Sequence, residues 1–456
     1  MKRRIAAAGW SYWPSGVRCS QWSSIFTWLH APSVLEPRGS DIVNRTSDWI
    51  CRLICAVACG LVVAGCTDTP PAAKAPESRP DTAVAPAADT GEPQLLSDDL
   101  LAEGWISLFD GLTLFGWQHD KRADWRVEDG TIVVEHGDKT LLTTTTQFAD
   151  YVLHVEFLRA PGTNSGIVLA TTPDPQDAAA DCYELNIADG DHPFPTGSLV
   201  DRQAVPKDLN RPEWQTFEVH VQAGHIVVSL DGQQVLDYTD PQPLLRGHVG
   251  LKHSQGRIAF RNVRLRPLGL EAIFNGHDLT GWKEYPELAS RFTVAEDGTL
   301  NVQNGRGQLE SEKQYGDFLL QLECISHAPG LNSGIFFRCV PGEDMNGYES
   351  QIHNVFKNGD RTQPADCGTG GIFRRADARR VVADDLQWFH KTIVAHGPHV
   401  AVWVNGYQVT DWTDTRPADP NPRKGLRLDP GTIMIQGHDP TTNLSFRNLR
   451  ATEMAW

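Results

Sequence analysis

The residues best suited to chemistry lie in one short segment of the C-terminal half of the chain. Glu349, Gln351 and His353 stand at every second position there. If this segment is a β-strand, alternate side chains project from one face, and the three polar groups form a row. Glu349 or His353 could then act as a general base. The non-functional alternative is that the row is only the polar face of a solvent-exposed strand.

Further charged residues near this row could complete a site. Arg338 ends an apolar segment and could stabilise an oxyanion, or it could form a structural ion pair. His438 precedes Asp439 and could donate a proton or bind a metal, or it could cap a loop. Arg374 follows a Gly-Gly turn and could close over a ligand. These Glu, His and Asp residues would also suit a divalent cation, but they show no fixed metal-ligand spacing.

Two other residues are candidates for contact with a ligand. Trp403 alternates away from Val402 and Val404, so it could stack on a sugar ring. Asn332 precedes Ser-Gly and is expected to shape a turn first and to touch ligand second. Trp282 and Trp388 recur at matching places of the two halves of the chain, and we interpret them as core anchors.

The elements that must position these residues are β-strands. His225–Leu230 alternates apolar and polar residues, Asp-Gly follows, and Val235 opens a returning strand. His399–Val404 followed by Asn-Gly repeats this pattern. Asp-Gly and Asn-Gly between alternating strands favour type I′ hairpins, because both turn residues need positive φ. Many short strands without an amphipathic helix predict an all-β sandwich or barrel.

The chain contains an internal repeat that covers residues 104–267 and 270–456. Collinear agreement at many places predicts two tandem copies of one domain. The matching motifs are Phe109-Asp110-Gly111 with Phe274-Asn275-Gly276, Asn164-Ser165-Gly166-Ile167 with Asn332-Ser333-Gly334-Ile335, Tyr183-Glu184 with Tyr348-Glu349, and Phe260-Arg261-Asn262 with Phe446-Arg447-Asn448.

The first copy departs from the second at the polar row. Glu184 keeps the carboxylate, but Asn186 and Ala188 replace the other two members, and Ala170 replaces the arginine. The first copy is therefore expected to bind sugar, with Glu184 as a contact, or only to pack on the second. A site built around Glu184, Asp189 and His253 remains an open alternative.

The ordered motifs of the second copy carry a family resemblance. Phe-Asn-Gly-x-Asp-Leu-x-Gly-Trp at 274–282, Asn-Ser-Gly-Ile-Phe-Phe-Arg at 332–338, Tyr-Glu-x-Gln-Ile at 348–352 and Phe-Arg-Asn-Leu at 446–449 resemble the 3-keto-disaccharide hydrolase family. The resemblance implies two concanavalin A-like jelly-roll domains. It also implies a 3-keto-glycoside substrate, supplied by a partner sugar 3-dehydrogenase.

The resemblance implies a particular chemistry for the second copy. A ketone at C3 acidifies the hydrogen on C2, so a base can remove it, and the resulting enolate expels the C1 substituent before water adds back. From this chemistry we expect a base, an acid or an enolate stabiliser among the catalytic candidates Glu349, His353, Arg338 and His438. The residues expected to contact the substrate are Asn332, Gln351, Arg374, Trp403 and Glu184.

Two other functions remain open on the residues alone. One is a non-catalytic carbohydrate-binding protein, because jelly rolls also serve as lectins. The other is a conventional glycosidase, which needs two opposed carboxylates, and the sequence offers no clear partner for Glu349. No Gly-x-Ser-x-Gly or phosphate loop is present, so serine-dependent and nucleotide-dependent mechanisms find no support.

The N-terminal residues read as an export signal. Residues 53–63 are an apolar run too short to span a bilayer, and Val63-Ala64-Gly65-Cys66 resembles a bacterial lipobox. We predict a signal region over 1–65, with the true start near residue 43, and lipidation of Cys66. Residues 66–95 are rich in Pro and Ala and are expected to form a disordered linker. The protein would then be exported and held at the cell envelope through its lipid alone.

Net charge and cysteine spacing argue against two classes of function, nucleic-acid binding and a cysteine-based zinc site. The net charge is −16, so nucleic acid is an unsuitable partner, whereas neutral sugars are compatible. The four cysteines after Cys66 form no CxxC pair, which argues against a cysteine zinc site. Cys324 and Cys339 flank one predicted turn and could form a disulfide or remain two buried thiols.

Overall fold

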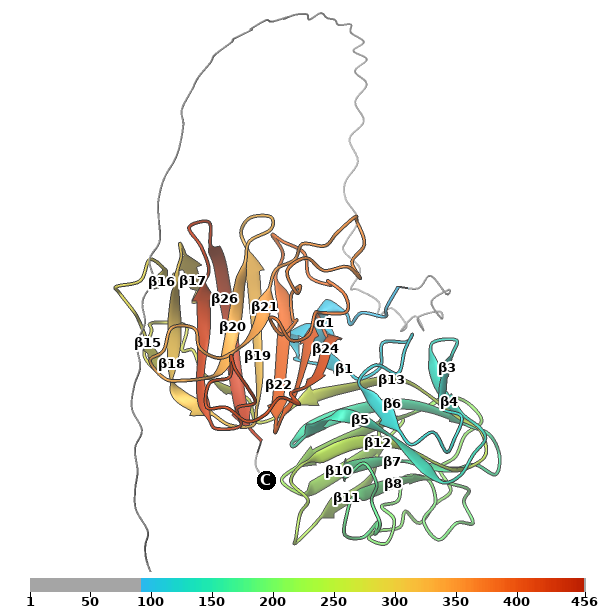
Figure 1. Ribbon diagram of the computed structural model, residues 1–456. Coiled ribbons are helices and arrows are strands. Elements are labelled where there is room, and N and C mark those ends of the chain that lie inside the picture. Colours follow the sequence, from blue (N-terminus) through green and yellow to red (C-terminus); the bar gives the residue numbers. More distant parts are fainter. Residues whose placement is uncertain (1–91, 455–456) are drawn as a thin grey trace, which may run out of the picture. The chain divides into compact units, whose positions relative to one another are not determined.

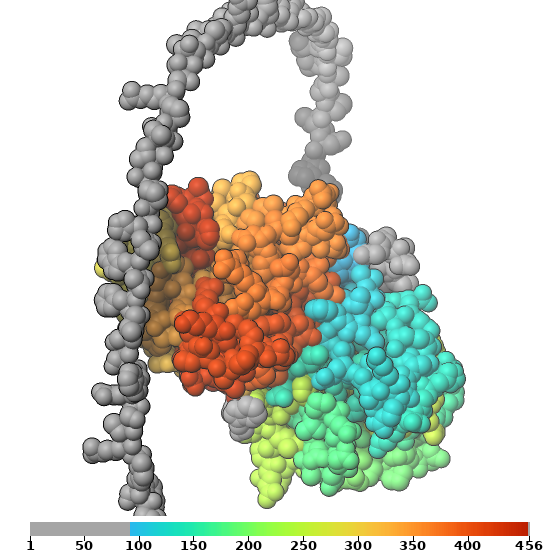
Figure 2. Space-filling view, in the orientation of Figure 1, coloured from blue at the N-terminus to red at the C-terminus, as the bar shows by residue number. Residues whose placement is uncertain are grey.

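A computed structural model describes residues 92–454 as an all-β protein with a single short helix, α1 (Asp98–Ala102), in that range (Figure 1). The predicted signal region, Cys66 and most of the predicted linker lie outside the described residues. Within 92–454, no helix is long and apolar enough to cross a bilayer. The space-filling view shows that side chains close the gaps between the ribbons (Figure 2).

The first β-sandwich contains thirteen strands in two antiparallel sheets. The larger sheet has the order β11-β10-β9-β6-β13-β4-β3, with β1 paired to β13, and the smaller has the order β2-β5-β12-β7-β8. The strands are β1 (Ile106–Ser107), β2 (Trp117–His119), β3 (Arg126–Glu128), β4 (Thr131–Val134), β5 (Thr140–Phe148), β6 (Tyr151–Arg159), β7 (Asn164–Thr171), β8 (Tyr183–Ile187), β9 (Gln215–Gln222), β10 (His225–Leu230), β11 (Gln233–Thr239), β12 (Gly247–Gln255) and β13 (Ile258–Pro267).

The second β-sandwich repeats this arrangement strand for strand. Its larger sheet has the order β16-β17-β26-β19-β22-β23-β24, with β14 paired to β26, and its smaller sheet has the order β15-β18-β25-β20-β21. The strands are β14 (Glu271–Ala272), β15 (Trp282–Lys283), β16 (Arg291–Val294), β17 (Leu300–Gln303), β18 (Gly307–Tyr315), β19 (Phe318–Ser326), β20 (Ser333–Cys339), β21 (Tyr348–Ile352), β22 (Phe389–His396), β23 (His399–Val404), β24 (Tyr407–Thr413), β25 (Gly431–Gly437) and β26 (Asn443–Glu453). The predicted all-β fold and its tandem repeat are confirmed.

Hairpin chemistry explains one pair of equivalent turns. β10 and β23 have the bounds expected from their alternating residues. The turn after β10 has φ of 51° at Asp231 and 77° at Gly232, and the turn after β23 has 47° at Asn405 and 71° at Gly406. These left-handed conformations are the ones that Asp-Gly and Asn-Gly tolerate.

The cysteines in the described residues are free thiols. Cys324 lies on β19 in the larger sheet of the second sandwich, and Cys339 lies on β20 in the smaller sheet. Both are buried, and burial raises the pKa of each thiol well above its ordinary value. The sequence left open whether Cys324 and Cys339 form a disulfide or remain two buried thiols, and the structure contains the two thiols.

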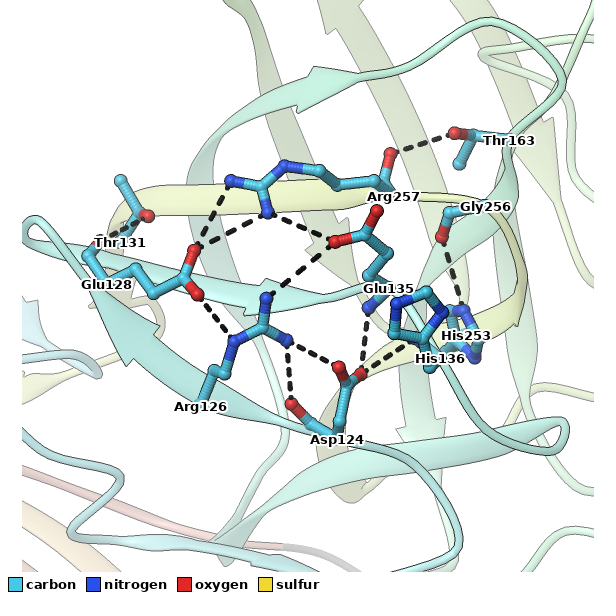
Figure 3. A network of polar contacts seen from close by, with 10 residues as sticks. All are labelled: Asp124, Arg126, Glu128, Thr131, Glu135, His136, Thr163, His253, Gly256 and Arg257. Atoms are coloured by element: carbon cyan, nitrogen blue, oxygen red, sulfur yellow. Dashed lines mark hydrogen bonds and ion pairs between the residues drawn. The ribbon is translucent and has the colours of Figure 1, made fainter.

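A network of charged side chains covers the edge strand β3 of the first sandwich (Figure 3). Arg126 contacts Asp124 and Glu128 at 2.6 Å each, and Arg257 reaches Glu128 at 3.4 Å and Glu135 at 3.9 Å. These side chains are partly exposed to solvent, so each pair adds little stability. Charges on an edge strand hinder pairing with another chain, and we interpret the network in that way.

Candidate functional site

A polar pocket of about 750 Å³ lies on the smaller sheet of the second sandwich. Its volume is in the range of pockets that hold small ligands. The strands β20, β21 and β25 supply its floor, and segments that connect the strands supply its walls. The lining residues are Arg306, Asn332, Phe336, Glu343, Asp344, Met345, Asn346, Glu349, Gln351, Asp366, Phe373, Arg374, Asn421, Arg423, Gln436 and His438.

Strand register places Glu349 and Gln351 together on the floor. On β21 they face Phe336 and Gly334 of β20, respectively. They are two residues apart, so their side chains project to the same side. A Cβ atom at Gly334 would lie 2.9 Å from Glu349 Oε1, so glycine at this position leaves room for the carboxylate.

Glu349 is a buried carboxylate with one arginine close to it. Its residue exposure is 5%, and Arg423 Nη2 lies 3.5 Å from Glu349 Oε2. Burial raises the pKa of Glu349, while the positive charges of Arg423 and His438 oppose this rise. A carboxylate that is hard to ionise but has nearby cations is suited to accept and return a proton.

His438 enters the pocket as part of a His-Asp pair. Its Nδ1 lies 2.8 Å from Asp439 Oδ2, and Asp439 also accepts a hydrogen bond from the Thr441 backbone N–H at 2.7 Å. Hydrogen bonds from Thr441 and His438 lower the pKa of Asp439 to about 2. An ionised Asp439 keeps a proton on Nδ1, so Nε2 is the nitrogen that can give or take a proton.

Asp366 is one of four pocket carboxylates, with Glu343, Asp344 and Glu349, and the sequence did not indicate it. Its Oδ2 accepts hydrogen bonds from Asn332 Nδ2 at 2.8 Å and from Gln351 Nε2 at 3.0 Å. Arg423 was missed as well. One signal could have found both: the segments 353–368 and 415–430 are longer than their counterparts 188–195 and 241–246 in the first copy.

The amides around the pocket have unused hydrogen-bonding capacity. One side-chain oxygen in each of these residues is buried and has no partner within the protein, in a region where buried polar atoms are normally paired. Hydroxyl groups of a sugar could donate to these acceptors. The atoms are Asn332 Oδ1, Asn346 Oδ1, Gln351 Oε1 and Gln436 Oε1.

Two residues predicted for the site of the second sandwich, Arg338 and His353, do not line the pocket. Arg338 is buried, pairs with Asp317 at 2.8 Å and donates to the Gly397 carbonyl, so it is a structural ion pair. His353 follows the end of β21, and its Nδ1 lies 3.1 Å from the Ala365 carbonyl. The site roles predicted for Arg338 and His353 are thus not supported by their positions.

Trp403 does not stack on a ligand. Its ring is buried, its Nε1 donates to the Ser107 carbonyl at 2.9 Å, and its ring centroid lies 6.3 Å from that of Phe148. The prediction of a sugar platform at Trp403 is wrong, because no face of the ring is open to solvent.

No group of three or more His, Cys, Asp and Glu side chains in 92–454 is arranged to hold a metal ion. The separation of His353 from the pocket breaks up the cluster of Glu349, His353 and His438 that the sequence suggested for a divalent cation. Glu349 and His438 both line the pocket.

In the first sandwich, the equivalent carboxylate is neutralised by a lysine. Glu184 forms an ion pair with Lys252, and both side chains are buried. Ser165 Oγ donates to the Lys252 carbonyl as Ser333 Oγ donates to the Gln436 carbonyl, so Lys252 occupies the place of Gln436. The buried ion pair therefore does not support the predicted contact of Glu184 with sugar.

The alternative site in the first sandwich is not assembled. Asp189 pairs with Arg159, and His253 contacts the backbone carbonyl of Asp138. His253 also contacts the backbone carbonyl of Gly256 (Figure 3). Pro193 stands where Asp366 stands in the second copy. In the second sandwich, by contrast, Glu349 and Asp366 line one pocket together with arginine and histidine side chains.

A β-sandwich with this polar pocket defines a class of protein that binds or transforms a polar ligand. The particular family follows from sequence comparison. The chain belongs to the family of 3-keto-α-glucoside-1,2-lyase-like domains, whose sequence profile matches residues 104–266 and 269–452. This confirms the predicted family resemblance in both copies. A relative of this chain is a 3-keto-disaccharide hydrolase, and the family acts on sugars.

Individual relatives are distant. A 3-keto-disaccharide hydrolase from Bacteroides thetaiotaomicron is 26% identical over 287 residues, which cover 47% of this chain and 97% of the relative. A candidate glycosyl hydrolase structure from Parabacteroides distasonis is 20% identical, with a TM-score of 0.35, and the match covers 39% of this chain and 100% of that one. A second such structure from that organism is 24% identical, with a TM-score of 0.33, covering 40% and 98%.

Proposed function

We propose that the second sandwich cleaves the glycosidic bond of 3-keto-glycosides in its pocket. The observation that carries the proposal is the buried Glu349 with Arg423 Nη2 at 3.5 Å and with His438 in the same cavity. A base with a raised pKa, a cation and a second proton-transfer group are what elimination from a keto-sugar needs. The family membership of the chain supports the same substrate class.

The proposed reaction begins at C2 of the oxidised ring. Glu349 removes the C2 proton, and the electron pair forms an enolate whose negative oxygen is the former C3 ketone. Arg423 is the cation available to stabilise that oxygen. The enolate re-forms the ketone, expels the C1 substituent, and His438 gives a proton to the departing oxygen. His438 is held for this role by Asp439.

Water completes the proposed cycle. It adds to C1 of the unsaturated ketone, while Glu349 returns its proton to C2 and the proton lost by the water restores His438. One water is consumed, and one glycosidic bond is replaced by a hydroxyl group at C1. No oxidant or reductant enters the balance. The C3 ketone must be formed beforehand by a sugar 3-dehydrogenase, which we propose as the partner activity.

Binding without cleavage is the second candidate function, and one observation favours it for the first sandwich. The carboxylate of Glu184 is paired with buried Lys252, which leaves that copy without a free base at the equivalent place. The first sandwich would then contact carbohydrate or support the second one.

The test is release of the aryl group from a 3-keto-aryl-glucoside by the purified mature chain. We expect turnover by the wild type and a loss of about 10²- to 10⁴-fold in kcat for Glu349→Gln. Glu312→Gln, which changes an exposed glutamate on β18, is the matched control. Equal turnover by Glu349→Gln would remove Glu349 from the mechanism.

Two further outcomes of this assay are informative. Absence of turnover with saturable binding of a glycan would assign the protein to the binding class. Loss of turnover with EDTA would indicate that a divalent cation takes part at the pocket.

We also propose that the enzyme is an exported lipoprotein. The support is the apolar run 53–63 followed by the lipobox-like residues ending at Cys66. In expressing bacteria, labelled palmitate should enter the wild-type protein and not Cys66→Ser. Equal labelling of the two proteins would refute lipidation at this residue.

A further inference from the structure

A buried lysine lies directly behind the strand that carries Glu349. Lys391 on β22 is 1% exposed, and its Nζ donates hydrogen bonds to the backbone carbonyls of Ser350 at 2.9 Å and Gln351 at 2.8 Å. Within residues 92–454 it forms no ion pair with a carboxylate. A desolvated ammonium held only by neutral carbonyls opposes folding.

The fold itself does not require a lysine at this place. In the larger sheets, Phe389 pairs with Cys324 as Gln215 pairs with Phe157, so Phe217 is the counterpart of Lys391. Phe217 stacks on Phe157 with ring centroids 4.9 Å apart. The first sandwich thus fills the same space with an apolar pair, and a feature that opposes stability in one copy alone points to a function there.

Lys391 bonds to β21, the strand that positions Glu349 in the pocket. β21 is the last strand of its sheet, and its outer edge is bonded only to the segment around Gly371 within the described residues. The Gly370 N–H donates to the Gln351 carbonyl, and the Gln351 N–H donates to the Gly371 carbonyl, each at 2.9 Å. Among the described residues, Lys391 is the only side-chain cation that donates to the backbone carbonyls of Ser350 and Gln351.

We propose that Lys391 is a positioning residue, which fixes β21 from behind and supplies positive charge that helps Glu349 to ionise. The inference rests on the proposed function, in which Glu349 is the base. Lys391 touches neither the pocket nor a substrate, and it would act through the backbone of β21 and through its electric field.

The titratable groups around Lys391 make its influence on Glu349 depend on pH. Lys391 is faced by the thiols of Cys324 and Cys367 and by Glu349, and burial lowers the pKa of Lys391 to about 7. His390, the neighbour of Lys391 on β22, projects to the other side of the sheet toward Glu323.

Besides Lys391, other groups from several elements act on Glu349. They are Arg423 from the segment 415–430, His438 after β25, and Asp366 from the segment 353–368. Below its own pKa, Lys391 carries a charge that favours ionised Glu349, so its removal should make Glu349 harder to ionise.

The experiment compares wild type, Lys391→Met and Lys313→Met in the mature chain. Lys313 is an exposed lysine on β18 and serves as the matched control. One measurement is the pH profile of kcat/KM on a 3-keto-aryl-glucoside. The other is NMR titration of ¹³C-labelled glutamate, with the Glu349 signal assigned from Glu349→Gln, which needs no turnover.

For Lys391→Met we expect a folded protein in which the acid limb and the NMR titration of Glu349 both move to higher pH by about half a unit. On the acid side this corresponds to about a threefold loss in kcat/KM. Lys313→Met should leave both unchanged. A merely structural role would lower the unfolding temperature without moving the titration of Glu349.

Unchanged titration of Glu349 in folded Lys391→Met would overturn the inference. If the wild type cleaves no keto-sugar, the proposed function fails, and the NMR titration still decides the role of Lys391. If Lys391→Met does not fold, Cys324→Phe with Lys391→Phe copies the apolar pair of the first sandwich and is measured in the same way. A wild-type titration of Glu349 in that double variant would equally contradict the proposal.

Discussion

Replacing Lys252 by methionine tests whether Glu184 is a structural residue. The side chains of Lys252 and Glu184 are 8% and 7% exposed, and their ion pair is the one salt bridge recorded for Glu184 within 92–454. Lys252→Met removes the cation and leaves a buried carboxylate without compensation. Breaking a buried pair in this way costs about 3 to 5 kcal/mol.

Calorimetry of the purified protein measures this loss. In a domain of 150 to 250 residues, about 1 kcal/mol corresponds to about 2–4 °C, so the transition of the first sandwich should fall by about 6–20 °C. Glu184→Gln combined with Lys252→Met leaves no buried charge and should recover most of the loss. Lys139→Met changes an exposed lysine of the same sandwich and should have little effect.

Two results would refute this reasoning. A loss below about 1 kcal/mol in Lys252→Met would show that the pair is not effectively buried. Loss of keto-sugar turnover at a temperature where the variant is folded would place the active site in the first sandwich rather than the second.

Three further predictions concern the pocket. Because burial raises the pKa of Glu349, the folded state holds a proton at pH values where the unfolded chain has released it. The free energy of unfolding therefore falls as pH rises from the ordinary glutamate pKa through the raised pKa. Glu349→Gln should reduce this fall when unfolding temperatures are measured over a series of pH values. Arg423→Met should move the acid limb of kcat/KM to higher pH, because Arg423 favours the ionised form of Glu349; an unmoved limb would contradict its role. Asp439→Asn should lower kcat by about 10- to 100-fold, and the loss should be far from additive with that of His438→Asn in a double-mutant cycle; additive losses would separate the two residues.

The fold could be predicted from the sequence because its signals are local and repeated. Asp231-Gly232 and Asn405-Gly406 fix two hairpins by backbone conformation alone. Ile226, Val228 and Leu230 are buried on one face of β10 as their alternation indicates. Collinear motifs then predicted a second copy, and the second copy has the same strand order.

Strand alternation predicted part of the site, and Asn332, Arg374 and His438, which were predicted without it, also line the pocket. Glu349 and Gln351 share a face because β21 is regular, and they line the pocket as the spacing suggested. Arg338 broke the pattern: its φ is 47°, and the pairing of β20 with β25 shifts register between Phe336 and Cys339, so the side chain turns toward Asp317.

The remaining differences depend on tertiary structure. Trp403 does alternate away from Val402 and Val404, but its face of the sheet is covered, which one strand cannot reveal. Asp366 and Arg423 lie on long irregular segments without periodicity. Their place in the pocket follows only from how those segments fold back over the sheet.

The matching strand order of the two copies has a consequence for engineering. The segments 353–368 and 415–430 extend connections of a scaffold that folds with shorter ones in the first copy. Doubling the length of a loop costs only about 0.6 kcal/mol in closure entropy. Grafting both segments onto the first sandwich together with Lys252→Gln would therefore test whether the pocket can be transferred from one copy to the other.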